Sequence, residues 1–187
     1  MPFYVVLCLM YKKNIVLIGM PGAGKSTIGV VAAKIMGYQF LDSDLVIQET
    51  YKMLLHELIN EHGDEGFWEL ENKVNASLAV SRTVIATGGS ACYGAEAMAH
   101  LSQTGTLVYL KLSYESLQER LGNLNTRGVT IKPGQTLLDL YHERIPLYEK
   151  YADITVDCEG EQLRDAAILV CERVKQAWGR ENEDDGV

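Results

Sequence analysis

Residues 14–27, which read NIVLIGMPGAGKST, constrain the fold of this chain more than any other stretch. An apolar run over 15–18 leads into Gly19, and the sequence then fits the pattern G-x-x-x-x-G-K-[ST] at every fixed position. Gly22 and Gly24 carry no Cβ, so the backbone can adopt positive φ angles and turn its N–H groups inward around a phosphate. The pattern predicts a phosphate-binding loop between a buried strand and a helix.

The residues after this loop supply the rest of a nucleotide site. The start of the helix predicted over 26–36 favours an anion through its dipole. Lys25 is expected to reach the terminal phosphates as a point charge, and the Ser26 hydroxyl to ligate the Mg²⁺ that accompanies them. A glycine-rich turn that carries a lysine by chance is the alternative. We favour the phosphate loop because a strand pattern precedes it and a helical pattern follows it.

Composition limits the class of protein. The chain has 187 residues, 47% of them hydrophobic, which suits one well-cored domain. Its formal charge is −8 and its longest basic cluster is Lys12-Lys13, so we expect no nucleic-acid partner. The four cysteines are scattered and form no C-x-x-C pair, which favours reduced thiols in a cytoplasmic protein over a zinc site or disulfides.

The two ends of the sequence are expected to lie outside the domain, which we place at 13–178. The apolar run over 2–10 is too short to span a bilayer, and it lacks the basic region and the cleavage site of a signal peptide. We therefore expect residues 1–12 to be an N-terminal extension, of which the first nine residues are loosely attached or form an added edge strand, with no membrane association. The polar, acidic segment 179–187 is expected to be disordered. A monomer is the simplest expectation.

Between these ends, apolar segments alternate with helical patterns. This order predicts a three-layer α/β fold, in which helices cover both faces of a parallel sheet. Strands are predicted over 14–19, 39–42, 83–87, 106–111 and 153–157. Helices are predicted over 26–36, 44–50, 54–61, 65–81, 94–102, 114–121, 136–150 and 161–178. In such a sheet, ligands bind at the carboxyl ends of the strands.

Two segments at predicted strand ends carry further chemistry. Asp42 and Asp44 close the second strand, and side chains two residues apart in an extended strand share a face. One carboxylate can hold Mg²⁺ through its water shell, and the other can lie beside a hydroxyl that is to be phosphorylated. The alternative is an N-cap at Ser43 or Asp44 for the next helix. Gly88 and Gly89 follow the third strand, where they allow close approach of a ligand or simply form a turn.

In their order along the chain, these segments resemble the shikimate kinases. The resemblance rests on GMPGAGKST, FLDSDLVIQE, GDEGFWELENKV, VIATGGS and HERIPLYEKYADITVD, and it spans about residues 13–178. It implies a P-loop fold like that of nucleoside monophosphate kinases, with a five-stranded parallel sheet and a lid. It also implies an ATP- and Mg²⁺-dependent transferase that phosphorylates a hydroxyl of a small hydroxylated carboxylic acid. For shikimate the product is shikimate 3-phosphate, in aromatic amino acid biosynthesis.

The resemblance also implies roles for individual residues. Asp42 matches a magnesium carboxylate, and Asp44 matches the residue that binds the acceptor hydroxyls and accepts a proton. Gly88 and Gly89 match the substrate loop, and Arg144 matches an arginine that holds the substrate carboxylate. The alternative for Arg144 is a solvated charge on a helix. The residues implied to hold the ATP phosphates are Gly22, Ala23, Gly24, Lys25, Ser26 and Thr27, together with Arg127 of the lid.

The chain also departs from the family pattern, and the departures lie at the acceptor and the lid. Phe67 is followed by Trp68 where the family has a second carboxylate-binding arginine. Trp68 is interpreted either as a wall of the substrate pocket or as part of the core. Ser90 replaces a third glycine of the substrate loop, and Gly128 replaces a proline of the lid. Three hypotheses follow: a shikimate kinase, a kinase of the same fold for another hydroxylated metabolite, and an ATP-binding module without catalysis.

Overall fold

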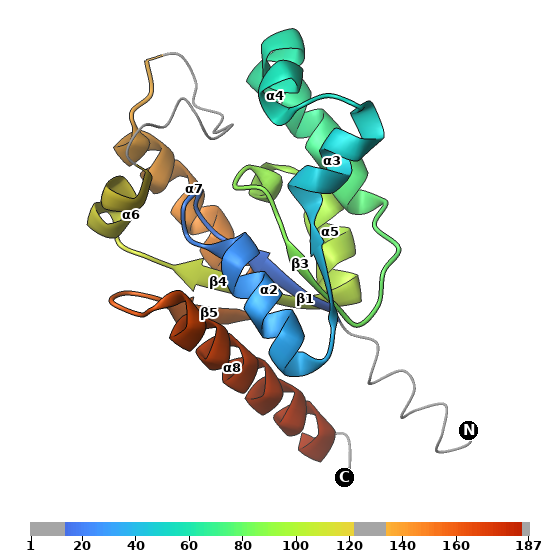
Figure 1. Cartoon of the computed structure of the whole chain (residues 1–187), viewed down its shortest axis with the longest axis vertical. Helices are drawn as coiled ribbons and strands as arrows, with labels where there is room; N and C mark the ends of the chain where they lie inside the picture. The colour runs from blue at the N-terminus through green and yellow to red at the C-terminus, as the bar shows by residue number, and fades with distance from the viewer. Residues whose placement is uncertain (1–13, 122–133, 185–187) are drawn as a thin grey trace.

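The computed structural model describes residues 14–121 and 134–184 (Figure 1). The N-terminal extension expected over 1–12 lies outside the described residues. So does Arg127, the arginine expected in the lid.

The centre of the fold is a five-stranded parallel sheet with strand order β2-β3-β1-β4-β5. The strands are β1 (Asn14–Ile18), β2 (Gln39–Asp42), β3 (Thr83–Ala86), β4 (Gly105–Lys111) and β5 (Ile154–Asp157). Each predicted strand is present to within one residue at either end. The fold class predicted from the sequence, a three-layer α/β sandwich, is confirmed.

Helices cover both faces of this sheet, as the register of the central strands shows. Leu17 and Ile18 of β1 are both buried and point to opposite faces, because successive side chains alternate along a strand. Helix α2 (Lys25–Met36) packs on the Leu17 face, where Gly29 lies close to the Leu17 side chain. Ile18 is in register with Tyr109 of β4, whose ring stacks on Tyr148 of α7 (Leu137–Tyr151) at 5.4 Å. Thus α2 and α7 lie on opposite faces (Figure 1).

The other helices extend these two layers. Helix α8 packs beside α2, and α4 packs on α5 (Figure 1). Their bounds are α3 (Ser43–Tyr51), α4 (Leu55–Ala76), α5 (Ala95–Thr104), α6 (Tyr114–Leu121), α7 (Leu137–Tyr151) and α8 (Leu163–Asp184), with a short 3₁₀ helix, η1 (Ala91–Tyr93).

Two helices differ from their predicted bounds by more than two residues at an end. Helix α4 joins the segments predicted over 54–61 and 65–81, with a kink at Gly63, whose φ is 68°. It ends at Ala76 because the chain must turn there to enter β3. Asn14 holds that turn: its Nδ2 donates to the Val80 carbonyl at 2.9 Å, and its Oδ1 accepts from the Thr83 N–H at 3.1 Å. Helix α8 continues to Asp184, whereas the sequence placed its end at 178.

A separate small core lies between α3 and α4. Ile47, Leu58, Phe67 and Val74 form this cluster, which is distinct from the main core around the sheet.

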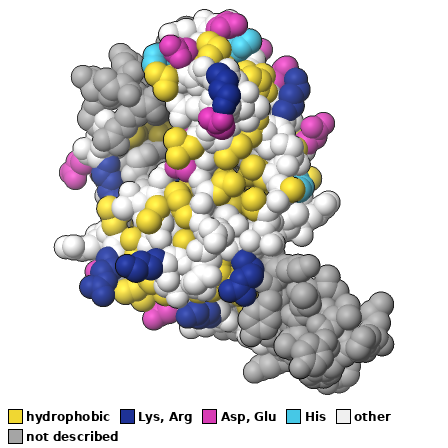
Figure 2. Space-filling model, turned by 45° about the vertical axis from the view of Figure 1, so that its right-hand side comes forward, with side chains coloured by type: hydrophobic (Ala, Val, Ile, Leu, Met, Phe, Trp, Pro, Cys, Tyr) yellow, Lys and Arg dark blue, Asp and Glu magenta, His cyan; other side chains and the backbone are white. Residues whose placement is uncertain are grey.

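Figure 2 shows hydrophobic side chains exposed among the charged ones on one face of the molecule. Within the described ranges, no helix is both long enough and apolar enough to cross a bilayer.

Candidate active site

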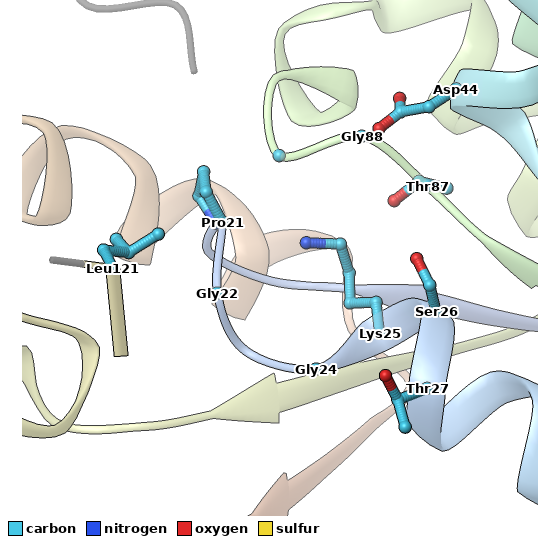
Figure 3. Close-up of a pocket in the computed structure, with 11 residues that line it drawn as sticks. Pro21, Gly22, Gly24, Lys25, Ser26, Thr27, Asp44, Thr87, Gly88 and Leu121 are labelled. Atoms are coloured by element: carbon cyan, nitrogen blue, oxygen red, sulfur yellow. The ribbon is translucent and has the colours of Figure 1, made fainter. Parts of the chain in front are cut away.

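A cavity of about 270 Å³ opens at the carboxyl ends of β1, β2 and β3. Lys25 and Ser26 extend toward it from the start of α2, and Thr87 and Asp44 bound its other side (Figure 3). Its lining residues are Pro21, Gly22, Gly24, Lys25, Ser26, Thr27, Asp44, Thr87, Gly88, Gly89 and Leu121. The structure thus brings together the phosphate loop, one of the two predicted aspartates and the predicted substrate loop.

The phosphate loop has the backbone that its glycines predict. Gly22 and Gly24 have φ angles of 81° and 90°, in the left-handed region that disfavours other residues. Lys25 is the first residue of α2 and is 8% exposed. Its Nζ donates to the carbonyls of Gly19 and Met20 at 2.7 and 3.0 Å. Burial lowers the pKa of Lys25 to about 8, and the carboxylate of Asp44 offsets part of that change.

Ser26 and Asp42 form an oxygen pair at the edge of the cavity. The Ser26 Oγ donates to Asp42 Oδ2 at 2.6 Å. No cluster of three or more potential metal-ligating side chains occurs within residues 14–121 and 134–184, so these residues hold no all-protein metal cage. A hydroxyl and one carboxylate suit Mg²⁺, which keeps several waters and binds mainly through a few carboxylates and substrate phosphates. The donor set therefore fits the predicted metal.

The relation between Asp42 and Asp44 differs from the prediction. The two do not lie two apart on one extended strand, because α3 begins at Ser43 and Asp44 is in its first turn. Asp42 itself is the N-cap, and its Oδ1 accepts from the Asp44 N–H at 3.0 Å. The predicted capping role is thus present, but on Asp42 and not on Ser43 or Asp44. Burial, followed by the nearby Asp42 charge, raises the pKa of Asp44 to about 6.

The substrate loop approaches its neighbours closely. A Cβ on Gly88 would lie 2.2 Å from Glu71 Oε1 and 2.9 Å from Asp44 Oδ1. A Cβ on Gly89 would lie 2.7 Å from the Pro21 ring and 3.2 Å from a terminal nitrogen of Arg144. These two glycines therefore allow neighbouring side chains to approach the backbone closely, which a simple turn would not require.

Ser90, which stands where the family has a third glycine, fits its place without strain. Its φ is −91°, a value that any residue adopts, and its side chain is buried. The departure at this position therefore leaves the backbone of the substrate loop intact.

Arg144 is buried next to the predicted substrate loop. It is 1% exposed, which excludes the alternative of a solvated helix charge. Its Nε donates to the Tyr93 hydroxyl at 3.1 Å, and its guanidinium lies 5.1 Å from the centre of the Tyr93 ring. Tyr93 in turn donates to Glu143 at 2.7 Å. Tyr148 also supports the loop, because its hydroxyl donates to the Gly89 carbonyl at 2.5 Å.

Trp68 reaches this end of the site through Tyr93. It is half-buried against the small core, and its ring lies 4.4 Å from the ring of Tyr93. Trp68 does not line the cavity described above. It packs on Tyr93, the aromatic side chain that contacts Arg144, which agrees with the predicted core role. The role of Trp68 as a wall of the substrate pocket stays a prediction.

Glu71 is a candidate site residue that the sequence analysis missed. It lies on α4, is 1% exposed, and neither carboxylate oxygen has a hydrogen-bond partner of ordinary geometry among the described residues. Burial raises the pKa of Glu71 to about 7, and the nearby Ser90 hydroxyl offsets part of the rise. The signal in the sequence was spacing: Glu71 stands three residues after Trp68, one helical turn away, where an arginine at position 68 would have paired with it.

Glu71 makes stability depend on pH. Its pKa is about 7 in the folded chain and near 4.5 in the unfolded chain. The unfolded chain therefore binds fewer protons between these values, so stability falls as pH rises through this window and stays lower above it. A shift of this size is worth on the order of 3 kcal/mol. We expect Glu71→Gln to raise the melting temperature by about 5 °C or more at about pH 8 and to change it little near pH 4.5.

Thermal unfolding followed by circular dichroism at both pH values checks this expectation. Glu69→Gln is the matched control, because Glu69 lies on the same helix and is exposed. A lower melting temperature for Glu71→Gln than for wild type at pH 8 would show that the carboxylate is satisfied and ionised in the fold.

Comparisons with known proteins match this geometry. The family model described as shikimate kinase matches residues 21–175. The chain is 34% identical to a shikimate kinase of Thermodesulfovibrio yellowstonii over 168 residues, which cover 87% of this chain and 96% of the relative. It is 35% identical to that of Methylococcus capsulatus over 172 residues, 90% of this chain and 96% of the relative.

Solved structures of shikimate kinases are similar to this chain as well. A shikimate kinase from Acinetobacter baumannii in complex with shikimate superposes with a TM-score of 0.80 at 31% identity, covering 91% of this chain and 97% of that one. The enzyme from Aquifex aeolicus superposes with a TM-score of 0.73 at 25% identity, covering 87% and 96%. This chain therefore belongs to the shikimate kinase family and is an ATP-dependent kinase with the P-loop fold of that family.

Proposed function

We propose that this chain transfers the γ-phosphoryl group of ATP to a hydroxyl of shikimate. The observation that carries the proposal is the position of Arg144, a buried cation next to the glycine loop that separates it from the phosphate site. An arginine guanidinium binds a carboxylate through two parallel hydrogen bonds. A hydroxylated carboxylic acid bound there would place its ring between Arg144 and Asp44.

Each group in the site then has one task. The phosphate loop and Lys25 hold the terminal phosphates, and Ser26 with Asp42 would hold Mg²⁺, which neutralises their charge when bound. Asp44 orients the acceptor hydroxyl and accepts its proton, a task suited to a carboxyl whose pKa is raised to about 6. We assign closure over the phosphates to Arg127, on the family resemblance. We place the reaction in the cytoplasm, as the scattered cysteines suggest, and on a single chain as the simplest case.

A second candidate is a kinase of the same fold for another hydroxylated acid. Trp68 favours this candidate, since it stands where a second carboxylate-binding arginine is expected and supplies an uncharged ring that packs on Tyr93. A module that binds ATP without catalysis is the third candidate. A buried acceptor-side arginine argues against it, because an ATP sensor needs no acceptor site.

A panel of hydroxy acids in a coupled ADP-release assay distinguishes the three candidates. We expect turnover on shikimate that requires Mg²⁺ and exceeds turnover on quinate or gluconate by at least about a hundredfold in kcat/KM, because one mismatched polar group costs several kcal/mol in a buried site. Faster turnover on another acid supports the second candidate. ATP binding without turnover on any acid supports the third.

A further inference from the structure

Glu71 is a buried carboxyl beside the proposed acceptor site with no assigned task. Its Oε1 lies against Gly88, on the side where Asp44 Oδ1 also lies, so two carboxyls meet the same segment of the substrate loop. It stays more than nine-tenths buried, and among the described residues only the Ser90 hydroxyl lies near it as a donor, without the geometry of a full hydrogen bond. A buried carboxylate without donors costs several kcal/mol, whereas a buried carboxylic acid costs much less.

The charges around Glu71 come from three helices. Asp44 faces it from α3, Lys25 from α2 and Arg144 from α7. The Ser90 hydroxyl and the Cys92 thiol face it from the substrate loop and η1. The two cations act on Glu71 through their charge alone, and the Asp44 carboxylate opposes its ionisation. Position 68, one helical turn before Glu71, holds a tryptophan and supplies no charge.

We propose that Glu71 is a specificity-determining residue that acts as a neutral acid. While Glu71 keeps its proton, it does not compete with an anionic acceptor for the charge of Arg144, and when it ionises, acceptor affinity falls. The inference rests on the proposed function only in taking the acceptor to be an anion. Compared with the family pattern, this site lacks one positive charge at position 68. A neutral Glu71 removes one negative charge, so the net charge of the acceptor site stays the same.

The dependence of the acceptor KM on pH tests this proposal. In wild type we expect the KM for shikimate to rise about tenfold between about pH 6.5 and about pH 8.5. Any change in kcat across this window should be the same in wild type and in Glu71→Gln, because the proton on Glu71 is needed for binding and not for phosphoryl transfer. Burial places the pKa of this carboxyl within that window. Glu71→Gln keeps a neutral side chain of the same shape, so its KM is expected to stay low and flat across the window.

Two controls separate charge from structure. Glu69→Gln changes an exposed glutamate on the same helix and should keep the wild-type rise in KM. The methyl ester of shikimate carries no charge, so its KM on wild type should not rise with pH. A rise of equal size in Glu71→Gln, or a flat profile in wild type, overturns the proposal, as does an equal rise with the ester.

Titration of the glutamate carboxyls in the wild-type protein tests the proposal without relying on a variant that has to fold. Protein labelled with ¹³C at the side-chain carboxyl of glutamate alone excludes Asp44 from the spectrum. We expect one glutamate carboxyl to titrate near pH 7, and its pKa to rise when shikimate binds. Ordinary acidic titration of every glutamate would refute the inference. This readout needs no turnover: if the chain phosphorylates none of the acids, the proposed function fails while the protonation state of Glu71 is still measured.

Discussion

Replacing Lys25 by alanine is expected to lower kcat by a factor of hundreds or more. Its ammonium group is held at the phosphate loop, on the carbonyls of Gly19 and Met20, and is largely shielded from water. A preorganised charge in a site that excludes water stabilises the transferring phosphoryl group strongly, and deleting one such group costs about 2.7 to 4 kcal/mol. The coupled ADP-release assay at saturating ATP and acceptor measures the loss.

The fold should survive this change. Burial lowers the pKa of Lys25, so the charged side chain disfavours the folded state and its removal relieves that cost. We expect the melting temperature to stay within a few degrees of wild type. Lys34→Ala is the matched control, because Lys34 is exposed in the last turn of the same helix. Activity of Lys25→Ala within tenfold of wild type would contradict the assignment of this lysine.

The sheet and the phosphate loop could be predicted because local sequence determines them. Ile15 to Ile18 form an unbroken apolar run, which a strand covered on both faces requires, and the four side chains are at most 1% exposed. Gly22 and Gly24 adopt positive φ angles that few other residues tolerate. In both cases a few adjacent residues carry the whole signal.

Features that depend on distant neighbours were missed or placed wrongly. The pKa of Glu71 depends on burial and on charges from α2, α3 and α7, none of which is close to it in the sequence. Asp44 is a local exception: the Asp42 side chain, two residues away, caps α3 and starts the helix at Ser43, so Asp44 does not lie on an extended strand. Helix α4 ends before 81 because Asn14, far away in the chain, holds the segment that enters β3. Local periodicity carries no information on such contacts.

Arg144→Ala is expected to raise the acceptor KM by about thirtyfold to a few thousandfold, with a smaller effect on kcat. Removing one partner of a buried, hydrogen-bonded charge pair costs about 2 to 5 kcal/mol, and the bound carboxylate would lose its cation. The effect falls on KM because the carboxylate does not react, so its contact with Arg144 is the same in the ground state and the transition state. Steady-state kinetics with shikimate as the varied substrate give both constants.

Further variants separate the charge of Arg144 from its packing against Tyr93. Arg144→Lys keeps the charge and loses the planar fork, so its KM should lie between those of wild type and Arg144→Ala. Arg164→Ala, an exposed position on α8, should change neither constant. The methyl ester of shikimate lacks the carboxylate, and so wild type and Arg144→Ala should handle it with similar KM values. If the variant lost as much activity on the ester as on the acid, Arg144 would serve the fold and not the acceptor, and the carboxylate would have to bind elsewhere.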